Sequence, residues 1–140
     1  MEWLKEILPD AGRVVTDGIE ERYLSDTLGR LRGRAAALVF VESTEEVSGI
    51  LREAHRRGVP VTPRGAGTNL VGSTVPADGG IVLDFTRMNR ILELDRDTMT
   101  VTVEPGILLE DLQRYVENKG LFYPPDPGEK ASTIGGNIST

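Results

Sequence analysis

The sequence contains no cysteine and only one histidine, which excludes several kinds of site at once. Without cysteine the chain has no disulfide framework, no thiolate nucleophile, no iron–sulfur cluster and no thiolate zinc site. A single histidine also excludes a metal centre built on several imidazoles. No apolar run approaches the roughly 20 residues of a membrane-spanning helix, and the acidic N-terminus does not resemble a secretory signal. We therefore expect a cytoplasmic protein, with a peripheral place on the inner membrane as the alternative.

The chain also lacks an excess of positive charge, because 16 basic residues stand against 22 acidic ones for a net charge of −6. Charges of both signs are spread along the sequence, so nucleic acid is not an expected partner. The one basic cluster, Arg30, Arg32 and Arg34, lies among glycines and is interpreted as a solvated loop.

Glycine and proline, in contrast, are abundant. The 16 Gly and 8 Pro among 140 residues exceed the average for the pair, which is roughly 12%. This content predicts many loops with special backbone geometry. Hydrophobic residues make up 39% of the chain, enough to bury a core, which excludes disorder. We expect a lead-in that is partly helical over residues 1–35, with Trp3 as a packing residue, and one domain over residues 36–140.

The hydrophobic pattern at the start of this domain predicts a β-α-β unit. A buried strand over residues 36–41 precedes Ser43 and Glu46, which have the spacing of a helix capping box. Apolar residues then recur at helical spacing up to Gly58, a residue suited to a helix C-terminus. A second strand follows over residues 59–62, and a right-handed crossover makes the two strands parallel.

The remaining pattern predicts a third strand over residues 81–85, a hairpin of strands 91–95 and 99–103, and a helix. The helix is expected to begin at Pro105-Gly106 and to close at Gly120. The inward positions expected in the second hairpin strand are Met99, Val101 and Val103, which alternate with threonines.

The strongest local signal is the stretch PRGAGTNLVGS, residues 63–73, which follows a buried strand. Glycines let successive backbone N–H groups converge on anionic oxygens, and Arg64 can add a charge-assisted hydrogen bond. A Walker A loop is excluded because Gly72 is followed by Ser73, with no lysine. A Rossmann fingerprint fails because Leu70 stands where a small residue is required. The pattern therefore predicts a loop that wraps a diphosphate.

A second cluster occupies residues 124–140. Pro125-Asp126-Pro127 restricts the backbone and fixes a carboxylate, and the following Ser, Thr, Gly and Asn residues present small side chains around an expected Gly-Gly-Asn turn. Glu104-Pro105-Gly106 would add a helix N-terminus, which favours anions. Together these segments predict one extended ligand held from two sides, with Gly67 and Gly136 in a shared groove.

In order and spacing, residues 63–72 (PRGAGTNLVG), 103–106 (VEPG), 124–128 (PPDPG) and 133–137 (TIGGN) resemble the FAD-binding domain of the vanillyl-alcohol oxidase/PCMH superfamily. The resemblance covers residues 35–140. Sugar-nucleotide reductases and the flavin subunits of molybdenum hydroxylases share this fold. The residues of the Pro-Asp-Pro and Gly-Gly-Asn motifs instead favour the branch of glycolate oxidase D subunits, D-lactate dehydrogenases and D-2-hydroxyglutarate dehydrogenases.

The resemblance implies a set of FAD-binding residues. Those implied to wrap the pyrophosphate are Arg64, Gly65, Ala66, Gly67, Thr68, Asn69, Gly72 and Ser73. Those implied to contact the diphosphate, ribityl and isoalloxazine portions are Pro105, Gly106, Asp126, Ser132, Thr133, Gly135, Gly136 and Asn137. Relatives that attach FAD covalently through the first loop carry histidine where this chain has Thr68, so non-covalent FAD is expected.

The implied fold is α+β, a PCMH-type FAD-binding fold with a small parallel β-α-β half and a mixed, mainly antiparallel half on either side of FAD. Family members continue beyond the Gly-Gly-Asn motif into a cap that binds the substrate. The chain is therefore expected to be an N-terminal fragment without that cap. Partner subunits or an electron-acceptor protein are left open.

The implied function is the FAD-binding portion of an oxidoreductase that converts a D-2-hydroxy acid, of the glycolate or D-lactate type, to the 2-oxo acid. The isolated chain is expected to be inactive, since no residue is predicted to be catalytic or to bind a metal. His55, Asp84 and Asp95 are interpreted as surface or turn residues. The alternatives are a non-catalytic module, truncated or split, that binds FAD or a nucleotide diphosphate, and a structural interaction domain.

Overall fold

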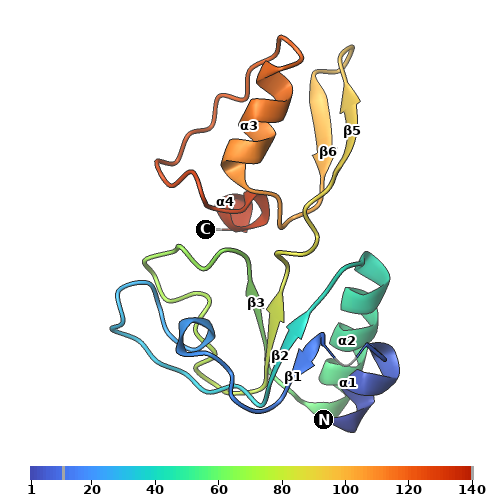
Figure 1. Ribbon diagram of the computed structural model, residues 1–140. Coiled ribbons are helices and arrows are strands. Elements are labelled where there is room, and N and C mark those ends of the chain that lie inside the picture. Colours follow the sequence, from blue (N-terminus) through green and yellow to red (C-terminus); the bar gives the residue numbers. More distant parts are fainter. Residues whose placement is uncertain (11, 140) are drawn as a thin grey trace.

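The chain builds two halves, each around its own sheet, in a computed structural model that describes residues 1–10 and 12–139 (Figure 1). The first half holds a sheet of four strands and the second a sheet of two. The elements of the first half are α1 (Glu2–Ile7), β1 (Val14–Val15), η1 (Glu21–Tyr23), β2 (Ala37–Phe40), α2 (Thr44–Arg57), β3 (Val61–Arg64) and β4 (Ile81–Asp84). Those of the second half are β5 (Ile91–Asp95), β6 (Thr100–Val103), α3 (Leu109–Glu117) and α4 (Ile134–Ser139).

The four-stranded sheet has the order β1-β2-β4-β3. Strands β2 and β3 both pair parallel with β4, and β1 pairs antiparallel with β2. The predicted β-α-β unit is therefore confirmed, with β4 inserted between its two strands. Helices α1 and α2 cover one face of this sheet (Figure 1). The α+β class expected from the sequence is also confirmed.

Helix α2 begins and ends as its sequence predicts. The Ser43 side chain accepts a hydrogen bond from the Glu46 N–H at 3.2 Å, and Gly58 ends the helix with a φ of 63°. Such a cap stabilises a helix by about 1 kcal/mol. Ile50 and Ala54 point into the first core, which also contains Trp3. The predicted packing role of Trp3 is confirmed.

The lead-in contributes more than a helix. Its two-residue strand β1, which the sequence analysis did not predict, forms an edge of the sheet. Arg13, buried at 8% exposure, pairs there with Glu42 and Glu46. The exposed positions of Arg30, Arg32 and Arg34 agree with their interpretation as a solvated loop, and His55 is exposed as well.

Two strand predictions are shifted in the structure. The strand expected at residues 59–62 is β3, Val61–Arg64, because Val59 N–H still bonds to Ala54 in the helix C-cap. Met99 does not point into the core as predicted. It is 67% exposed, and its φ of 56° places it in the hairpin turn before β6.

Two further predictions in the second half are wrong. Helix α3 begins at Leu109 and not at Pro105-Gly106, because the Gly106 N–H bonds to the Met88 carbonyl at 2.7 Å. The Gly-Gly-Asn motif lies inside helix α4, Ile134–Ser139, and is not a turn. Ile134 packs with residues of α3 into a second core, which explains why these small residues adopt a helix.

The two halves meet at a junction formed by residues 85–90 and 104–107. Arg90 binds the buried Glu104 carboxylate through its backbone N–H and its guanidinium, at 2.8 and 2.6 Å. These hydrogen bonds lower the pKa of Glu104 against the opposing effect of burial. A Cβ on Gly106 would lie 1.9 Å from the Phe85 carbonyl oxygen. The junction therefore requires glycine at this position.

We predict that Gly106→Ala lowers the free energy of unfolding by about 1–3 kcal/mol, because the backbones of the two junction segments must separate. Gly49→Ala is the matched control. Its Cβ meets only ordinary contact at 3.6 Å from Ile7, and alanine is favoured within a helix, so a gain of about 0.5–1 kcal/mol is expected. Urea denaturation of both variants checks this. Equal stability of the Gly106→Ala variant and the unchanged chain would contradict the close approach.

Candidate functional site

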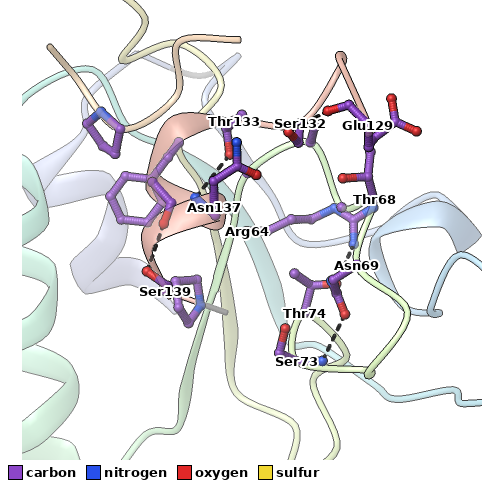
Figure 2. A pocket seen from close by; sticks show the side chains of 18 of the residues that line it. Arg64, Thr68, Asn69, Ser73, Thr74, Glu129, Ser132, Thr133, Asn137 and Ser139 are labelled. Carbon is purple, nitrogen blue, oxygen red and sulfur yellow. Dashed lines mark hydrogen bonds between the residues drawn. The ribbon is translucent and has the colours of Figure 1, made fainter. Parts of the chain in front are cut away.

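A cavity of about 590 Å³ lies between the two halves. One wall is the end of β3 and the loop that follows it, and the opposite wall is the segment that leads into α4 (Figure 2). Phe85 after β4 and Pro105 at the junction close the space between these walls. The size lies within the range of small-molecule sites, roughly 300–1,000 Å³.

The structure brings the two predicted clusters together. Gly67 and Gly136 line the same cavity, so the shared groove expected from the sequence is present. The predicted site residues that line it are Arg64, Gly65, Ala66, Gly67, Thr68, Asn69, Ser73, Pro105, Ser132, Thr133, Gly135, Gly136 and Asn137.

Three predicted site residues do not line the cavity. Gly72 has a φ of 73° and packs against Leu31, so it shapes the loop behind the cavity wall. Gly106 lies in the junction described above, where its backbone packs against the Phe85 carbonyl. Asp126 is exposed and forms an ion pair with Lys130.

The cavity also has lining residues that were not among the predicted FAD-binding residues: Pro63, Leu70, Thr74, Phe85, Pro127, Glu129 and Ser139. Most of them are neighbours of predicted residues. Ser139 donates to the Gly135 carbonyl at 2.7 Å, one helical turn back, so a prediction of helix α4 would have found it. Phe85 could not be predicted as a cavity residue, because an apolar residue directly after a strand cannot be distinguished in the sequence from the strand itself.

The first wall is a loop, residues 65–74, whose conformation is stabilised by hydrogen bonds of the Asn69 side chain. Its side-chain oxygen accepts hydrogen bonds from the Val71 and Ser73 N–H groups at 3.3 and 3.2 Å, and its amide donates to Thr74 at 3.0 Å. Within the described residues, the backbone N–H groups of residues 66–70 donate no hydrogen bond. Such a row of N–H groups is suited to bind anionic oxygens.

Arg64 is charged yet only 7% exposed. Its Nη1 donates to the Thr74 hydroxyl at 3.3 Å, and its guanidinium carbon lies 5.3 Å from the centroid of the Tyr23 ring. Burial lowers the pKa of Arg64, and the negative charge of Asp84 opposes that shift. Because an arginine side chain stays protonated in proteins, a positive charge is fixed in the cavity wall.

The second wall is held by backbone pairing with the junction and α3. Thr133 pairs with Leu108 as an antiparallel bridge, and Leu109 N–H bonds to the Ser132 carbonyl at 2.8 Å. The Gly135 N–H bonds to the Pro105 carbonyl, also at 2.8 Å. These contacts fix the small side chains of this segment toward the cavity, where Figure 2 shows Ser132, Thr133 and Asn137.

The two walls are in direct contact at Gly65. A Cβ on Gly65 would lie 2.1 Å from the Thr133 hydroxyl oxygen, so the Gly65 backbone packs directly against that side chain. Gly65 leaves β3 and Thr133 precedes α4, so this contact joins the two halves beside the cavity. Any residue larger than glycine would push the walls apart.

None of the helices in the described part of the chain combines the length and the apolar character needed to cross a membrane. The expected cytoplasmic place stays a prediction.

Comparison with known proteins identifies the family of this chain. The sequence model of a family described as FAD binding domain matches residues 35–140. The glycolate oxidase subunit GlcD of Bacillus subtilis (strain 168) is 47% identical over 131 residues, which are 93% of this chain and 26% of that protein. A D-lactate dehydrogenase of Anaerostipes hadrus is 43% identical over 142 residues, covering 100% of this chain and 30% of its own length. This chain thus spans less than a third of these curated relatives.

Solved structures with the same fold include an alkyldihydroxyacetonephosphate synthase, with a TM-score of 0.84 and 26% identity over 99% of this chain and 29% of that chain. A BBE-like protein of Physcomitrella patens gives a TM-score of 0.78 and 27% identity, over 96% of this chain and 30% of its own. With a family match that covers most of its length, the chain belongs to the FAD binding domain family, and its cofactor is FAD.

Proposed function

We propose that the cavity between the two halves is the FAD site, with the loop of residues 65–74 around the diphosphate and the segment of residues 132–137 beside the rest of the cofactor. The observation that carries this proposal is the convergence of both segments on one cavity, through the contact of Gly65 with Thr133.

The residues present fit such a ligand. A diphosphate is anionic, and the first wall offers the N–H groups of residues 66–70 and the buried charge of Arg64. The hydroxyl and amide groups of Thr68, Ser132 and Asn137 suit the ribityl and ribose hydroxyls. Glu129, the acidic group in the lining, suits a sugar hydroxyl better than a phosphate, because a carboxylate only accepts hydrogen bonds.

For the whole protein we propose oxidation of a D-2-hydroxy acid, of the glycolate or D-lactate type, to the 2-oxo acid. The relatives named glycolate oxidase and D-lactate dehydrogenase support this proposal. Bound FAD would supply the redox chemistry by accepting two electrons. The residues described here would bind and orient FAD, and none of them is assigned a proton transfer. We propose that the substrate binds in a part of the longer protein that this chain, at less than a third of its relatives' length, does not span.

The proposed FAD site predicts that a side chain at position 67 weakens cofactor binding. Gly67→Ala should weaken FAD binding at least tenfold, about 1.4 kcal/mol, because the new Cβ would lie 2.0 Å from the Arg64 guanidinium within the loop. Gly120→Ala is the matched control, since Gly120 has a similar φ of 73° with no atom near its Cβ and lies outside the cavity. Titration of flavin fluorescence measures both. Equal losses of affinity in the two variants would count against the site.

Thr68 predicts how the cofactor is held. Threonine has no group that attaches to flavin as histidine does in relatives with covalent FAD, so we expect all of the flavin to leave the protein on acid precipitation. Absorbance of the supernatant and the pellet measures the distribution. Flavin that stays with the pellet would contradict a non-covalent site.

The substrate class predicts which compounds reduce the flavin. In the protein that contains this chain, loaded with FAD and kept free of oxygen, glycolate or D-lactate should bleach the oxidised-flavin absorption, while L-lactate should leave it unchanged. Each turnover moves two electrons and two protons from the hydroxy acid. An absorption that none of these acids changes would favour the non-catalytic binding module.

A further inference from the structure

Residues 20–33, here called the brace segment, lie outside the part of the chain that matches the family model, yet they contact the cavity loop. Figure 1 shows the brace segment in light blue beside the green loop that follows β3. The Thr27 hydroxyl donates a hydrogen bond to the Gly67 carbonyl at 2.8 Å. A Cβ on Gly72 would lie 2.4 Å from Leu31, so this side chain packs directly on the loop backbone.

A third contact is made through Arg64. The guanidinium lies over the Tyr23 ring, at 5.3 Å from its centroid. It also lies against Gly67 and donates a hydrogen bond to Thr74. Burial, and then the negative charge of Asp84, raises the pKa of Tyr23, and the faces of such aromatic rings attract cations. Tyr23 thus contacts Arg64, the cation that lines the cavity among the described residues.

The brace segment is itself ordered by internal hydrogen bonds. The buried Asp26 carboxylate accepts from the Leu31 N–H at 2.8 Å, and the Asp26 N–H donates to the Leu31 carbonyl at 3.2 Å. The Gly33 N–H bonds to the Leu24 carbonyl at 2.7 Å, and Ser25 pairs with Arg32 across the same turn. A segment closed in this way can transmit a fixed geometry to the loop it contacts.

The contacts of the brace segment lie at the part of the loop that is proposed to bind the diphosphate. The Gly67 carbonyl that Thr27 holds belongs to the stretch whose N–H groups face no protein acceptor among the described residues. Fixing one carbonyl fixes the plane of the peptide that carries the next N–H, which is that of Thr68. Fixing the Arg64 guanidinium sets the position of the positive charge relative to those N–H groups.

We propose that the brace segment pre-organises the diphosphate loop, with Tyr23 and Thr27 as positioning residues for FAD binding. This inference rests on the proposed FAD site. It assigns a role in cofactor affinity to a segment that precedes the family match, and to side chains that do not line the cavity.

The test compares pairs of variants in the full chain. Tyr23→Ala and Thr27→Val remove the ring and the donor, and each should weaken FAD binding about tenfold. Tyr23→Phe and Thr27→Ser retain the ring and the donor, and both should restore affinity to within about twofold. Tyr115→Ala is the matched control, because Tyr115 is also half-buried with a cation, Lys119, over its ring, yet lies outside the cavity. Flavin fluorescence gives the affinity, and urea denaturation without FAD gives the stability.

Weaker FAD binding in the two disruptive variants, with rescue by the two conservative ones and unchanged affinity in Tyr115→Ala, supports positioning by the brace segment. Full affinity in Tyr23→Ala and Thr27→Val overturns it. It is also overturned if affinity falls only in proportion to stability, to the same degree in Tyr115→Ala. Failure of the unchanged chain to bind FAD at all would instead refute the proposed site.

Discussion

The arrangement of this molecule depends on two places where the backbone of a glycine lies so close to another part of the chain that a side chain larger than hydrogen does not fit. At Gly106 the junction passes under the Phe85 carbonyl, and at Gly65 the end of β3 meets Thr133 before α4, where added Cβ atoms would lie at 1.9 and 2.1 Å. These two contacts hold together halves that otherwise have separate hydrophobic cores. The cavity lies between the two halves, beside the contact of Gly65 with Thr133.

This construction separates stability from binding. Among the described residues, the buried members of the two cores do not line the cavity, and Phe85, which packs against the first core, also lines it. The other parts of the walls are mainly loops, small side chains and backbone groups. The one buried cation of the wall is neutralised by no direct ion pair among the described residues and is instead held by Thr74 and the Tyr23 ring. A dinucleotide bridge carries the negative charge that this arrangement leaves unbalanced, which is the physical reason that a diphosphate suits it.

The sequence predicted elements whose signals are local and failed where distant contacts decide. Ser43 and Gly58 marked the ends of α2 because caps act within one helical turn. The start of α3 was misplaced because Gly106 is engaged by Met88, and strand β1 is too short to carry a pattern. Both clusters of the site were found from small residues and glycines. Tyr23 and Thr27 were missed, since Thr27 lies 40 positions from the carbonyl it binds.

Hydrogen–deuterium exchange with and without FAD tests the central claim, that one ligand is held by both walls at once. Residues 66–70 should exchange rapidly in the free chain, because their N–H groups have no acceptor among the described residues. FAD should slow exchange in this loop and in residues 129–139 together, with the same half-saturating concentration. Protection of only one wall, or of the two walls at different FAD concentrations, would contradict a single shared site.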